Sequence, residues 1–496
     1  MIVLKKIISF ILALTVALCI SGCRNNRDKG ETNEVKKANE TLKIHCFAYD
    51  SLNPLDNDNE TTMQMLRLVF ESLIECDETQ YPKMLLAEGY SVSPDGLLWN
   101  IKLKKGVKWH DDTDLTANDV LYTYNYVIEN AENSAYKINV SNIESVSIVG
   151  DNEVSFKLAA PQSNFINLLE IPIVKAQNGA EFYPVGTGPY VYSETKNKIV
   201  HLKANDKWHK GKVSIKNIEA KILPDAETSI YAYVSKEIDV VTVNSGNGLG
   251  DYTSNSDNAI VDYPSNTFNF VGINTSTEPL SNRLFRKAIA HAIDKSSINS
   301  EVLLSHGAVA DSCIHPKWWV YNSGVTKYPY SQDKALNVLN DVKKTMKISA
   351  ISLMVNTENQ NKVKVAEIIK KNLADCGISL YIEYVDWATF TERVATGNYQ
   401  MYLGTVKYSA EINPQYVFSN PSVSMQKLFV ELQQQTTEEG VKKKYYEIQE
   451  KAALELNIIP LYFDVNMVMY NNRIEGQVNP CRINVFNGIE GLKLSR

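Results

Sequence analysis

The sequence of 496 residues lacks the residue patterns on which most enzymes and metal sites depend. Its seven histidines form no H-x-x-x-H or H-x-x-E-H pattern, which would place two metal ligands on one face of a helix. It contains no G-x-S-x-G turn to expose a serine nucleophile and no G-x-x-x-x-G-K-[ST] loop to hold phosphates. We therefore expect neither catalysis nor a resident metal or cofactor.

Closely spaced cysteines and clustered basic charge are also missing. The seven cysteines are scattered without C-x-x-C spacing, which argues against a disulfide framework and against a zinc site. The formal net charge is −6, and removal of Lys5 and Lys6 with an export signal leaves −8. A nucleic-acid partner is therefore not expected.

The first 22 residues have the order of an export signal. Two lysines precede an apolar run over 7–20, which is shorter than the roughly 20 residues that cross a bilayer. The next residues, Ile-Ser-Gly-Cys at 20–23, resemble the bacterial lipobox, in which cleavage leaves an acylated cysteine. We expect Cys23 to be this lipid-carrying N-terminus and the polar stretch 24–40 to be a flexible tether. The alternative is a plain secretory signal with an incidental cysteine.

Strand and helix patterns alternate along the rest of the chain. Apolar residues at helical spacing predict helices over 61–75 and 115–129, the second with Thr116 as N-cap and Asp119 as its capping-box partner. Alternating segments at 97–104, 146–150 and 153–160 predict a small sheet early in the chain. From residue 181 onward, helices followed by apolar strands predict sheets covered by helices, which is an α/β fold.

Four stretches carry motifs in a fixed order. They are LLAEGYSVSPDG…GVKWHDDTDLTANDV in 85–124, YPVGTGPYVY in 183–192, VGINTSTEPLSNRLFRKAIAHAID in 271–294, and a set of helical segments in 330–463. Together they resemble the family 5 solute-binding proteins, the oligopeptide-, dipeptide- and nickel-binding receptors of ABC importers. Within the second stretch, Gly186 and Gly188 flank Thr187, and we expect a structural backbone turn there, where glycine tolerates positive φ.

The resemblance implies an α/β fold of the two-lobed periplasmic-binding-protein type II, with an additional inserted domain. A signal peptide over 1–22 and the lipidated tether over 23–40 would precede three domains. Domain I is expected over 41–72, 180–270 and 472–496, domain II over 73–179, and domain III over 271–471. The chain would cross between the lobes near Phe270 and again near Tyr470, and ligand would lie in the cleft between them.

Peptide binders of this family hold the ligand's α-amino group with an aspartate in a GW.AD…DP stretch. In the corresponding region, 399–418, Gly404 and Pro414 match the two ends of that motif, but the region contains no aspartate. Glu411 is the only acid left there and is our candidate for the ammonium, while Lys407 is the candidate for an anionic ligand group. The alternative for both is a solvated surface side chain.

Aromatic side chains are the second set of candidates for lining the cleft, because a ring with a polar tip suits varied ligand side chains. The candidates are Trp318, Trp319, Tyr321, Trp387 and Tyr408. For each of them the alternative is packing within domain III.

The resemblance implies a monomeric, lipid-anchored receptor on the outer face of the cell membrane, which delivers peptides to an ABC permease and its ATPase. The missing aspartate leaves open a receptor of the same fold for a nickel chelate or another non-peptide solute. A third possibility is a sensor of extracellular peptide signals that performs no transport.

Overall fold

The computed structural model describes residues 40–176, 182–244 and 258–495. The expected signal peptide, Cys23 and most of the tether lie outside these ranges. No helix among the described residues is both long and apolar enough to span a membrane. The cysteines at 46, 76, 313, 376 and 481 are all buried free thiols.

The first lobe contains two four-stranded sheets. One has the order β1-β10-β9-β8, with β1 and β10 parallel and the other pairs antiparallel. The other has the antiparallel order β4-β5-β7-β6 and comes from the early segments for which a sheet is predicted. The strands are β1 (Thr41–Phe47), β4 (Ala87–Val92), β5 (Leu98–Leu103), β6 (Ile143–Gly150), β7 (Glu153–Leu158), β8 (Tyr190–Lys196), β9 (Ile199–Ala204) and β10 (Asn217–Leu223).

Helices and short strands complete this lobe. Helix α4 (Ala117–Glu129) packs on the second sheet, where Tyr124 and Phe156 meet edge to face at 4.7 Å between ring centroids. The predicted capping box is confirmed, since the Thr116 N–H donates to Asp119 Oδ2 at 2.8 Å. The remaining elements are α3 (Glu60–Leu66), β2 (Ile74–Cys76), β3 (Pro82–Met84), α5 (Lys137–Val140), α6 (Phe165–Leu168), α7 (Ala226–Val234), β18 (Ile474–Glu475) and β19 (Lys493–Leu494).

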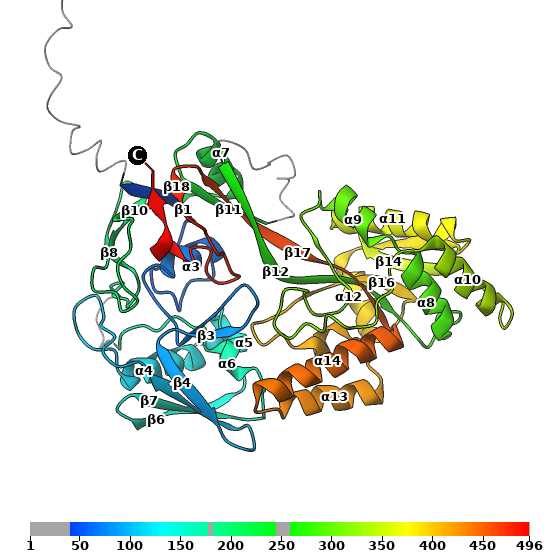
Figure 1. The fold of residues 1–496 in the computed structure, drawn as a ribbon, viewed down its shortest axis with the longest axis horizontal. Helices are drawn as coiled ribbons and strands as arrows, with labels where there is room; N and C mark the ends of the chain where they lie inside the picture. Colours follow the sequence, from blue (N-terminus) through cyan, green and yellow to red (C-terminus); the bar gives the residue numbers. More distant parts are fainter. Residues whose placement is uncertain (1–39, 177–181, 245–257, 496) are drawn as a thin grey trace, which may run out of the picture.

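A seven-stranded sheet continues into the second lobe, in the order β11-β17-β12-β16-β14-β15, with β13 paired to β17. Figure 1 shows the long strands β12 and β17 side by side, running from the part of the molecule that holds β1 and β10 to the part that holds β14 and β16. The strands are β11 (Val240–Asn244), β12 (Asn258–Ile273), β13 (Ala308–Val309), β14 (Ile351–Asn356), β15 (Leu380–Val385), β16 (Met401–Lys407) and β17 (Ile458–Asn471).

Helices of the second lobe cover this sheet and extend from it. Each lobe has its own buried apolar cluster, so the fold is two-lobed and α/β as expected. The helices are α8 (Arg283–Ala292), α9 (Lys295–Val302), α10 (Gln332–Lys343), α11 (Gln360–Asp375), α12 (Trp387–Thr396), α13 (Val423–Gln433) and α14 (Glu438–Glu455).

The single helix predicted over 61–75 is wrong beyond residue 66. Helix α3 ends there because the next carbonyl groups pair with the glycine motif. The Gly188 N–H donates to Val69 O and the Tyr190 N–H donates to Leu68 O, both at 2.9 Å. Long-range pairing therefore overrides the apolar period.

Neither Gly186 nor Gly188 adopts the positive φ that glycine tolerates. They are required for close approach instead. A Cβ at Gly186 would lie 1.8 Å from Val69 O, which is far inside van der Waals contact.

Candidate functional site

A cavity of about 530 Å³ lies between the first lobe and the strands that cross between the lobes. One wall comes from α3 and the loop before it, from the region of α5, and from the C-terminal segment. The floor comes from β12, β16 and β17. The lining residues are Asn57, Asp58, Glu60, Met63, Gln64, Arg67, Ala135, Tyr136, Asn139, Glu170, Ser265, Asn266, Thr267, Lys407, Asp464, Asn466, Arg482 and Ile483.

Most of the residues that line this cavity have polar side chains. Met63, Ala135, Ile483 and the ring of Tyr136 are its apolar parts, and charges of both signs are present. Ligand pockets are more often apolar with a few polar groups. This cavity therefore suits a hydrophilic ligand with many hydrogen-bonding groups.

Asp464 is the half-buried acid of the floor. It lies on β17, where its Oδ1 accepts a hydrogen bond from Asn269 Nδ2 at 3.0 Å. Burial raises the pKa of the Asp464 carboxyl to about 6, against the opposing effects of that hydrogen bond and of the Lys362 charge. Lys362 is held on the side of the second lobe, where its Nζ donates to Leu403 O at 3.2 Å. A cation in the cavity would therefore stabilise the charged form of the Asp464 carboxyl.

Lys407 is the cation of the floor. It ends β16 directly opposite Thr267 of β12, which also lines the cavity. Among the described residues its ammonium has neither an ion pair nor a side-chain hydrogen bond. Since β12 lies between β16 and β17, Lys407 and Asp464 stand two strand spacings apart, about 10 Å at the backbone. Opposite charges therefore face one cavity from the two strands that flank β12.

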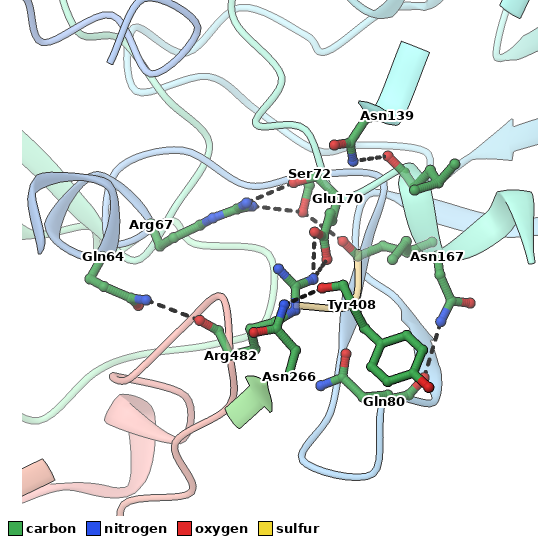
Figure 2. Close-up of polar contacts among 12 residues, drawn as sticks. Gln64, Arg67, Ser72, Gln80, Asn139, Asn167, Glu170, Asn266, Tyr408 and Arg482 are labelled. Atoms are coloured by element: carbon green, nitrogen blue, oxygen red, sulfur yellow. Dashed lines mark hydrogen bonds and ion pairs between the residues drawn. The ribbon is translucent and has the colours of Figure 1, made fainter. Parts of the chain in front are cut away.

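The other buried charges of the wall are already paired with protein groups (Figure 2). Arg482 Nη2 donates to both carboxylate oxygens of Glu170 at 2.5 Å. Arg67 donates to Ser72 Oγ at 3.1 Å and to the Glu170 carbonyl at 2.7 Å. We conclude that this network shapes the wall, because Arg482 and Glu170 form an ion pair and Arg67 is held by two neutral oxygen atoms.

Hydrogen bonds from side-chain amides to main-chain carbonyl groups fix the edge of the wall and the floor. Figure 2 shows that Gln64 Nε2 donates to Arg482 O at 3.2 Å and that the Asn266 amide donates to Tyr408 O. Asn139 and Asn167 likewise donate to main-chain carbonyl groups, at 2.8 and 3.1 Å. The polar groups around the cavity are therefore held in place before any ligand arrives.

Of the candidates from sequence, Lys407 lines the cavity, whereas its neighbour Tyr408 points away from it. Tyr408 is 2% exposed and its hydroxyl donates to Cys313 O at 2.6 Å. Trp318 packs edge to face on Tyr408, with ring centroids 5.5 Å apart, and also on Phe463. Tyr408 and Trp318 therefore pack within the second lobe, which is the alternative given for them in the sequence analysis.

The other three aromatic candidates also lie outside the cavity lining. Trp319 is half-buried and meets Tyr81 of the first lobe edge to face at 5.6 Å between ring centroids. Tyr321 is half-buried and packs against the second-lobe cluster. Trp387 is 52% exposed and stacks on Phe390 within α12. A role for these residues in ligand binding stays a prediction.

Glu411 lies at a contact between the lobes and not in the cavity lining. It is only 7% exposed, and its carboxylate accepts a hydrogen bond from the Gln162 amide. The capture of an ammonium by this residue stays a prediction. Asp464 was missed, although a sequence signal marked it, since it is the single charged residue within β17.

Comparison with known proteins agrees with this fold. Residues 82–427 match the family described as bacterial extracellular solute-binding proteins, family 5 Middle. The chain is 24% identical over 519 residues to the oligopeptide-binding protein AppA of Bacillus subtilis, covering 94% of each chain. It is 23% identical over 424 residues to heme-binding protein A of Haemophilus influenzae, covering 77% of each. Among solved structures, the ABC transporter substrate-binding protein CtaP of Listeria monocytogenes aligns with a TM-score of 0.72 at 19% identity, over 92% of this chain and 99% of that one.

Proposed function

Because this chain belongs to family 5 of the bacterial extracellular solute-binding proteins, we propose that it binds peptides in the cleft between its lobes and delivers them to an ABC import permease. The observation that carries the proposal is the pair of opposite charges on the cleft floor, Asp464 and Lys407. A peptide with free ends carries an ammonium and a carboxylate at a separation set by its length. The relative AppA is named for binding oligopeptides.

In this proposal the ammonium of the peptide binds Asp464 and its carboxylate binds Lys407. Each contact is a charge-assisted hydrogen bond, which is stronger than a neutral one. The amides and hydroxyls of Ser265, Asn266 and Thr267 lie between the two charges along β12 and can bind the peptide main chain. With no nucleophile or general base assigned to the cleft, the ligand would leave intact.

The cleft supports a peptide better than haem or a nickel chelate. A haem needs a wide apolar slot, whereas most of the residues that line this cavity carry charged, amide or hydroxyl groups. No histidine or cysteine is among the lining residues, so the protein would add no imidazole or thiolate ligand to a chelated nickel ion. We therefore rank haem and a nickel chelate behind a peptide as the ligand of this cleft.

Thermal unfolding of the 24–496 fragment tests this choice of ligand, after bound solutes have been stripped by reversible denaturation. A mixture of synthetic tripeptides with free ends is expected to raise the melting temperature, since a ligand at one hundred times its Kd adds about 2.7 kcal/mol of stability. Haem and nickel–histidine, as matched additives, are expected to leave it unchanged. A rise with haem or nickel–histidine alone would make the alternative the correct function.

We further propose that Cys23 carries the lipid that keeps the receptor at the membrane. The Cys23→Ala variant is expected to move from the membrane fraction to the soluble fraction, because two or more acyl chains are needed for stable anchoring. Cys19→Ala, within the apolar run, is the matched control and should stay with the membrane. Retention of Cys23→Ala in the membrane fraction would refute the lipid anchor.

A further inference from the structure

The two lobes meet a second time, at the end away from the crossing strands. Figure 1 shows α13 and α14 reaching from the second lobe toward β3, β4 and α6 of the first. Tyr81 Oη donates to Glu438 Oε2 at 3.0 Å, and the Trp319 N–H donates to Thr79 O at 2.9 Å. The cleft is therefore bounded by the crossing strands at one end and by this contact at the other.

The loop over 409–413 forms the buried part of this contact. Asn164 of the first lobe is 4% exposed and its amide donates to Glu411 O at 2.9 Å and to Tyr445 Oη at 2.7 Å. The Gln162 amide donates to the Glu411 carboxylate. Gln162 and Asn164 of the first lobe thus hold the loop over 409–413 of the second lobe.

This loop also contains a strained residue. Ile412 has φ of 53°, in the left-handed region that β-branched residues strongly avoid. The Tyr445 hydroxyl donates to Ile412 O at 2.8 Å and holds the carbonyl in this conformation. Strain of this kind persists only where surrounding contacts enforce it, and it is concentrated at sites that switch.

The charge of Glu411 opposes the contact as well. Its side chain is buried and is bonded to the Gln162 amide, and no ion pair to it exists among the described residues. A buried carboxylate without a cation is costly, and a single amide offsets only part of that cost. The contact is therefore balanced between hydrogen bonds that favour it and strain and desolvation that oppose it.

We infer that the loop over 409–413 is a latch that closes the cleft, with Gln162 and Asn164 as its catch in the other lobe. Parting of the lobes frees Glu411 to water and allows Ile412 to relax, so the closed and open forms are close in free energy. Glu411 in this account is a positioning residue for closure. The inference extends the proposed function by regulating the same cleft, but closure itself needs no ligand.

Small-angle X-ray scattering of the stripped, ligand-free protein tests the latch. Gln162→Glu places a second carboxylate against Glu411, and Asn164→Ala removes both hydrogen bonds that Asn164 donates, so each is expected to increase the radius of gyration. Gln360→Glu makes the same chemical change at an exposed helix end and is the matched control, expected to leave the radius unchanged. Acidification should reverse the effect in Gln162→Glu, because two facing carboxylates share a proton readily.

The peptide mixture provides the second readout. Opening of the latch reduces the fraction of closed molecules, so Gln162→Glu is expected to weaken peptide binding at least fivefold. An unchanged radius in either variant, with a native circular dichroism spectrum, would overturn the latch. If no peptide binds but both radii increase, the latch stands and the proposed ligand fails.

Discussion

Asp464→Asn is expected to weaken peptide binding at least tenfold at pH 7.5, measured by titration calorimetry. The substitution keeps the shape of the side chain but removes the charge that faces the ligand's ammonium. Removing one partner of a desolvated charge pair typically costs about 2–5 kcal/mol. Asp58→Asn, at an exposed position of the same lining, is the matched control and should change the affinity less than threefold.

The pH dependence of binding gives the same residue a second signature. Since the pKa of Asp464 is raised to about 6, the carboxyl becomes neutral as the pH falls through that value and no longer attracts an ammonium. Wild-type affinity should therefore fall between pH 7.5 and 5, while that of Asp464→Asn stays flat. The stability of the ligand-free protein should instead rise as the pH falls from 7.5 to 5. The carboxyl binds a proton more tightly in the folded state, where its pKa is about 6, than in the unfolded state, where it is near 4. Wild-type affinity in Asp464→Asn would exclude Asp464 from the site.

Gly186→Ala is expected to lower the free energy of unfolding by at least about 3 kcal/mol in guanidinium titrations, because overpacking against fixed atoms cannot relax. The added Cβ would lie 1.8 Å from Val69 O and 2.6 Å from Val69 C, which are backbone atoms. The turn cannot easily shift away, since the Thr187 hydroxyl donates to the buried Glu71 carboxylate at 2.9 Å.

Gly89→Ala is the matched control for this stability measurement. A Cβ at Gly89 would meet no atom within 4 Å, and its φ is not positive. We expect a change within about 0.5 kcal/mol. Equal stability of the two variants would refute close approach as the reason for the glycine at 186.

Much of the fold followed from the sequence because its motifs report on local packing. The capping box of α4 and the helix–strand alternation each predict structure from neighbouring residues. The prediction of a helix over 61–75 was wrong after residue 66. There the carbonyl groups of Leu68 and Val69 bond to residues distant in the sequence, and this pairing ends the helix. Apolar periodicity carries no information about such pairing.

The cleft was harder to predict because the direction of each side chain depends on strand register. Lys407 and Tyr408 are adjacent, and in extended backbone one faces the cavity while the other faces the core. The sequence could not tell which, and both residues were candidates for ligand contact. Asp464 faces the cavity near a register shift between β12 and β17, which no sequence pattern reports. A lone charge in an apolar strand was the available signal.

Mass spectrometry of the solutes released when the purified 24–496 fragment is denatured tests the central claim most directly, because a cleft that closes over its ligand retains it through purification. The account predicts a set of short peptides with free amino and carboxyl ends. Release of haem, or of a nickel chelate, in place of peptides would contradict it.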